Sequence, residues 1–160
     1  MEAYPQVLDA LKAWFDARGD ENARTEVDGV PMLRAMVPLL GGGRGLVLME
    51  IFVIPYGEGT ELLQFYTTVT KEDGPGMDDL RRAANAWNLS ALAGGYGIYE
   101  PAGQLFHRHT VALATDLPQQ AREETALEAL YVTVDEITRR LPEAIGILNP
   151  PASGTPQETP

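Results

Sequence analysis

The hydrophobic pattern of the chain changes between helical and extended spacing along its length. Apolar residues recur every three or four positions over 4–18, 78–91 and 119–141, which is the spacing of amphipathic helices. Between these ranges, shorter apolar runs bounded by Gly, Pro or Asp predict strands at 24–27, 30–39, 46–55, 61–69, 96–100 and 104–115. The predicted order is α-β-β-β-β-α-β-β-α, an α+β fold with an antiparallel sheet and helices packed on it.

Turn and cap residues place the boundaries between these elements. Asp28-Gly29 predicts a tight hairpin, and 57–59 and 101–103 predict the turns of two further hairpins. Gly94-Gly95 is expected to end the central helix, and Pro142 is expected to end or bend the last helix. The glycine-rich loop Gly41–Gly45 lacks the Lys-Ser/Thr of a phosphate-binding loop and precedes a strand, so it is interpreted as a flexible connection.

The early strands are apolar on both faces. In the run 46–55, one face is entirely apolar, and the other is apolar except for Glu50. Helices can cover one face, so the second would be exposed on a monomer, and exposed apolar surface of that size usually marks an interface. We therefore expect a homodimer or a bound protein client at a surface formed by Met32, Arg34, Met36, Leu48, Glu50, Phe52, Leu62, Gln64 and Tyr66.

The hairpins also predict which residues pair across the sheet. Centring the first connection in the glycine-rich loop places Arg34 opposite Glu50, and centring the next on 57–58 places Glu50 opposite Gln64. Opposite charges across a ladder are mildly favourable, and a one-residue slip would turn Glu50 into the core. This polar row is interpreted as a device that sets the register, or as one that orients a docked partner.

His107 and His109 are the candidate metal or acid–base residues. They lie two positions apart on a predicted strand and share one face, which we expect to be solvated. Two imidazoles can bind zinc, but the sequence offers no third ligand at a matching spacing and no partnered nucleophile. We therefore predict no catalytic residue, no metal and no cofactor. The alternative is a small-ligand or metal-binding sensor or enzyme in which these histidines converge with Glu50 and Arg34 on a pocket.

Composition narrows the class of partner. The 160 residues suit one domain, expected at 1–148, followed by a disordered Pro-rich tail at 149–160. With 12 basic and 23 acidic residues the net charge is -11, which disfavours nucleic acid and anionic membranes and leaves a protein partner. The chain has no cysteine, and its first residues lack the pattern of a signal peptide, so a cytoplasmic protein is expected.

Particular residues within this order resemble a bacterial family. The chain is similar to the YbjN-like proteins, which are proposed regulators of sensory transduction grouped with type III secretion chaperone-like folds. The resemblance covers roughly 3–148 and rests on Asp28-Gly29, Leu33-Arg34, Asn85-Ala86-Trp87-Asn88, 96–111 and Val134-Asp135. It implies an α+β sheet with helices on one side, frequent pairing as a dimer, and the binding of proteins instead of the conversion of substrates. The loop Gly41–Gly45 and the tail depart from the family pattern.

Overall fold

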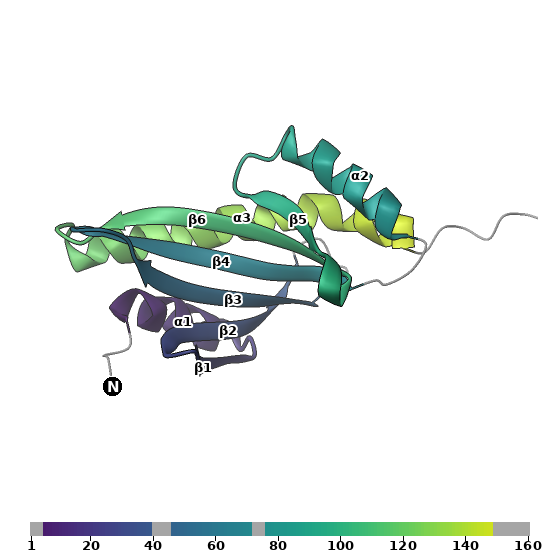
Figure 1. The fold of residues 1–160 in the computed structure, drawn as a ribbon. Coiled ribbons are helices and arrows are strands. Elements are labelled where there is room, and N and C mark those ends of the chain that lie inside the picture. The colour runs from purple at the N-terminus through teal and green to yellow at the C-terminus, as the bar shows by residue number, and fades with distance from the viewer. Residues whose placement is uncertain (1–4, 40–45, 72–75, 149–160) are drawn as a thin grey trace, which may run out of the picture.

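The computed structural model describes residues 5–39, 46–71 and 76–148 (Figure 1). The predicted loop Gly41–Gly45 and the predicted tail at 149–160 lie outside these residues. Within them the chain forms, in order, α1 (Gln6–Arg18), β1 (Asn22–Val27), β2 (Val30–Pro38), β3 (Leu46–Pro55), β4 (Thr60–Lys71), α2 (Met77–Asn88), β5 (Gly95–Tyr99), a short 3-10 turn (Glu100–Ala102), β6 (Gln104–Ala114) and α3 (Gln119–Leu148). The predicted α+β class and element order are confirmed.

The described strands form a six-stranded antiparallel sheet in the order β1-β2-β3-β4-β6-β5. The hairpin between β1 and β2 turns at Asp28 and Gly29, whose φ angles of 50° and 81° fit the left-handed conformation that such a turn requires. This confirms the hairpin predicted from the Asp-Gly pair. Gly103, at φ 55°, closes the turn before β6.

Helices α1, α2 and α3 all pack on one side of the sheet, which we call the inner face. Helix α1 contacts β1, β2 and β3, α3 contacts β4 and β6, and α2 packs against β5 and α3. Figure 1 shows α1 and α3 running alongside the strands, with α2 beyond β5. The inner-face side chains of β2, β3 and β4 join the buried residues of these helices in one core, which includes Leu33, Met49, Ile51, Leu63 and Phe65.

Helix α2 ends earlier than Gly94-Gly95, the predicted limit. Its last residue is Asn88, and this side chain bonds to the backbone of β5: its Nδ2 donates to the Tyr96 carbonyl at 2.9 Å, and its Oδ1 accepts from the Tyr96 amide at 2.6 Å. An asparagine that satisfies the backbone of another segment competes with helix continuation. These two hydrogen bonds therefore explain the early end of α2.

The sequence predicted an end or a bend of the last helix at Pro142. Helix α3 continues past it to Leu148, so the first of these alternatives is wrong. Proline removes one backbone donor, a loss that tertiary contacts can offset. Beyond it, Ala144 is buried in the core, and Glu143 Oε2 accepts a hydrogen bond from Trp87 Nε1 at 2.7 Å. The last part of α3 is therefore held by the contacts it makes with α2.

Candidate functional site

The opposite side of the sheet, the outer face, is covered by no helix of the described chain. Its side chains come from the strand positions that alternate with the buried ones. Most of them are half-buried or exposed even though they are apolar. Every residue of the predicted partner-binding set lies on this face: Met32, Arg34, Met36, Leu48, Glu50, Phe52, Leu62, Gln64 and Tyr66.

One part of the outer face is hollowed. The hollow has a volume of about 500 Å³ and is lined by Val27, Asp28, Val30, Met32, Glu50, Phe52, Ile54 and Tyr66. Its lining includes three exposed apolar side chains, those of Val27, Val30 and Ile54. Met32 is almost fully buried even though no helix covers it, because it sits among its neighbours at the floor of the hollow.

The predicted polar row is correct for one pair and wrong for the other. Arg34 lies opposite Glu50, and its Nη2 and Nε contact Glu50 Oε1 at 2.7 and 3.2 Å. Glu50, however, pairs with Tyr66, while Gln64 lies opposite Phe52. The pairing of Glu50 with Tyr66 centres the hairpin on Glu58, one residue later than the centre at Gly57 that a Glu50–Gln64 pairing requires. Because this moves the partner by an even number of residues, Gln64 stays on the outer face.

Tyr66, which lines the hollow, also contacts an aromatic residue of β6. Its ring stacks on Phe106 with 4.9 Å between centroids, and Phe106 in turn lies over Gly97, where an added Cβ would come within 2.6 Å of the ring. Burial and the nearby Glu50 carboxylate raise the pKa of the Tyr66 hydroxyl, so it stays protonated as a hydrogen-bond donor. The outer face therefore combines an acidic group, a phenol and apolar rings.

The sequence prediction missed several residues of this face. Val27, Val30, Ile54 and Phe106 were not among the expected residues, although the structure places them on the outer face. The period-two alternation of each strand contains the necessary signal: Ile54 shares its parity with Phe52, and Val30 shares its parity with Met32. Asp28 was read only as a turn residue, yet it also lines the hollow.

His107 and His109 lie on the inner face, so the prediction of a solvated face is wrong. His107 is fully buried, and its Nε2 donates to the Ala93 carbonyl at 2.8 Å. His109 Nδ1 lies 2.9 Å from the hydroxyl of Thr133 on α3. Burial lowers the pKa of both imidazoles, so both favour the neutral form. Arg34 and Glu50 project from the other face of the sheet, so the four groups of the alternative hypothesis do not converge.

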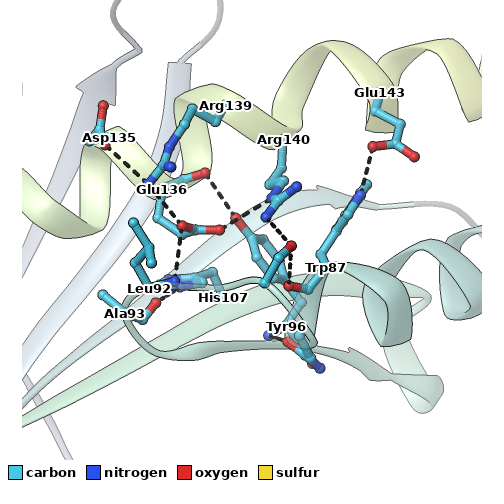
Figure 2. Close-up of polar contacts among 12 residues, drawn as sticks. Trp87, Leu92, Ala93, Tyr96, His107, Asp135, Glu136, Arg139, Arg140 and Glu143 are labelled. Carbon is cyan, nitrogen blue, oxygen red and sulfur yellow. Dashed lines mark hydrogen bonds and ion pairs between the residues drawn. The ribbon is translucent and has the colours of Figure 1, made fainter.

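A buried carboxylate near His107, that of Glu136, forms ion pairs within α3 where this helix packs on the sheet. Glu136 is fully buried and forms ion pairs with Arg139 and Arg140 at 3.1 and 3.2 Å (Figure 2). Arg140 also donates to the Ser90 hydroxyl at 2.8 Å, which ties the segment after α2 to α3. Two guanidinium groups compensate the charge of Glu136, as a buried carboxylate requires.

Within 5–39, 46–71 and 76–148, no group of three or more His, Asp or Glu side chains is placed to hold a metal ion. None of the helices described for this chain is long and apolar enough to cross a membrane.

These features define a class of protein: an α+β domain whose antiparallel sheet has helices on one face and an apolar, hollowed surface on the other. A solved structure has this fold. The crystal structure of YbjN from E. coli, described as a proposed transcription regulator, matches with a TM-score of 0.51 and 14% identity over 85% of this chain and 92% of that chain. The fold is therefore YbjN-like, in agreement with the resemblance noted from the sequence. No protein-family model matches the chain, and no curated protein matches its sequence.

Proposed function

We propose that this protein is a non-enzymatic protein-binding module, a regulatory adaptor or chaperone, which docks a polypeptide on the outer face of its sheet. The observation that carries the proposal is the contrast within single strands: both faces carry large apolar side chains, but only those of the inner face are covered by the described helices. Leaving such a surface in water costs roughly 25 cal/mol per Å², which a partner would recover on binding.

The proposal is supported by the kind of side chain that forms the surface. Met32 and Met36 provide flexible apolar contacts, and Phe52 and Tyr66 provide the aromatic contact area that dominates protein interfaces. Arg34 and Glu50 add one ion pair that can fix the orientation of a partner. A second copy of the chain at this face would give the homodimer expected from the sequence, and another protein would make the chain an adaptor.

The fold of YbjN fits this proposal without adding a mechanism. YbjN is described as a proposed transcription regulator, and regulation by a chain with a net charge of -11 is more compatible with binding another protein than with binding DNA. We place the protein in the cytoplasm as part of the same proposal.

Affinity capture from the native host tests the proposal when it compares matched variants. Ile54→Lys puts a charge at the rim of the hollow, at a side chain already 36% exposed, so the fold should tolerate it. Leu89→Lys makes the same change at a leucine that is 90% exposed and lies at the end of α2. We expect Ile54→Lys to lose the dominant partner and Leu89→Lys to retain it. Retention by both variants, with melting temperatures unchanged, would refute the docking surface.

A further inference from the structure

The two charged residues that line the hollow are both acidic, and one of them, Glu50, is ion-paired with Arg34 of the same face. The other is Asp28, and none of the lining residues is basic. Arg34 approaches from outside the lining, and both of its contacts use the same oxygen of Glu50, Oε1. The apolar floor of Met32 and Phe52 is therefore bordered by two carboxylates, on a chain whose net charge is -11.

We propose that the occupant of the hollow is a basic amphipathic helix of a protein partner, with its apolar side chains in the hollow and its Lys or Arg side chains beside Asp28 and Glu50. This inference rests on the proposed function and specifies its partner. The acidic lining attracts such a helix at close range, and the net charge of -11 steers it from a distance. A second copy of the chain would bring a further charge of -11 and its own two carboxylates to the same place.

The dimensions of the hollow suit one helix. Its lining spans β2, β3 and β4, with the β1–β2 turn at one side. Neighbouring strands lie about 4.8 Å apart, so β2 to β4 covers roughly 10 Å, which is close to the diameter of a helix with its side chains. A volume of about 500 Å³ accommodates several large apolar side chains at i, i+3, i+4 and i+7. Met32 at the floor can adapt its shape to them.

Two synthetic peptides test this assignment with the full chain. Both are helices of about 18 residues with leucine at i, i+3, i+4 and i+7; one carries lysine at the polar positions and its twin carries glutamate. Fluorescence anisotropy of the labelled peptides gives the two dissociation constants. We expect the basic peptide to bind about tenfold or more tightly than the acidic twin, and to weaken as salt is raised.

A matched pair of charge variants separates the hollow from the overall charge. Asp28→Asn with Glu50→Gln removes both carboxylates of the lining, and asparagine tolerates the positive φ of position 28. Glu124→Gln with Glu128→Gln removes the same charge from the exposed side of α3. We expect the first variant to bind the basic peptide several-fold more weakly, and the second to bind it like the unaltered chain.

The outcomes distinguish this inference from the proposed function. Equal binding of the two peptides, equal weakening by the two charge variants, or no binding of either peptide would overturn the basic helix as the partner. If Ile54→Lys then still removes the captured protein or dissociates a homodimer, the docking surface stands with a different occupant. If Ile54→Lys changes neither, the proposed function fails as well.

Discussion

The two faces of the sheet are built from the same strands with similar side chains, yet they differ in what they contact. In β3, Met49 and Ile51 are fully buried beneath the helices, whereas Leu46 and Ile54 on the other face are 60% and 36% exposed. Both faces are rich in aliphatic and aromatic residues, and the outer face also carries Arg34, Glu50 and Gln64. Their apolar side chains differ in exposure because α1, α2 and α3 are all placed on one side.

This difference assigns separate roles to the two faces. The inner face stabilises the fold, because its side chains leave water when the helices pack. The outer face retains apolar surface that folding alone does not bury, so its apolar residues contribute less to the stability of the monomer. The proposed docking of a partner gives this apolar surface a role. Paired substitutions on the two faces test this contrast.

The largest expected effect is on the inner face. Phe65→Ala should lower the free energy of unfolding by about 3–5 kcal/mol, because Phe65 is fully buried and the substitution leaves a cavity. Phe52→Ala, on the half-buried outer face, should cost only about 1 kcal/mol. Urea unfolding followed by circular dichroism measures both values. Similar losses for the two variants would contradict the separation of roles.

A smaller effect concerns the attachment of the helical layer to the sheet. Asn88→Ala removes the two hydrogen bonds that join the end of α2 to Tyr96 in β5, and should cost about 1–2 kcal/mol. Asn85→Ala, on the exposed side of the same helix, is the control and should change stability by less than about 0.5 kcal/mol. Amide exchange at Tyr96 should accelerate only in the first variant; acceleration in both would refute this role of Asn88.

The inner-face histidines make stability depend on pH. Burial lowers the pKa of His107 and His109 in the folded state, so the unfolded chain binds more protons. Their contribution is therefore complete above the unfolded histidine pKa of about 6.5 and is lost as pH falls below it. The urea midpoint should decrease between about pH 7.5 and 5.5, and less steeply in His107→Gln. A urea midpoint that rises as the pH falls from about 7.5 to 5.5 would contradict the burial of neutral histidines.

The smallest expected effect on stability is on the outer face. Arg34→Met removes the ion pair with Glu50, in which the arginine side chain is 49% exposed. Pairs of this kind contribute about 0.2–1 kcal/mol, so urea unfolding should show at most a small loss. A loss of several kcal/mol would mean that the ion pair stabilises the fold more than it orients a partner.

Much of the fold was predictable from the sequence because its signals are local. Helical periodicity, the Asp28-Gly29 turn and the alternation of strand residues gave the element order and the pairing of Arg34 with Glu50. The pairing of Glu50 with Gln64 failed because turn residues at 57–59 allow more than one centre for the hairpin. The end of α2 was missed because it depends on the hydrogen bonds between Asn88 and Tyr96 of β5, which helical periodicity does not reveal.

In the candidate site, too, local sequence patterns predicted some features, and tertiary contacts determine the others. The nine expected outer-face residues were placed on one side by alternation, but the hollow requires the β1–β2 turn to lie beside β3, which no local pattern reveals. His107 and His109 were assigned to solvent because they are polar. They share their parity with Leu105 and Leu113, which are both buried, and this signal would have placed them inside.

The chain provides its own probes for the central claim, that the outer face is the surface that binds a partner. Met32 and Met36 lie on the outer face, whereas Met49 and Met77 are buried in the core beneath it. Methyl-labelled methionine NMR, with and without the captured partner, reports on both regions in one experiment. We predict that the signals of Met32 and Met36 shift on binding while that of Met77 does not. Shifts confined to Met77, with Met32 and Met36 unchanged, would contradict the account.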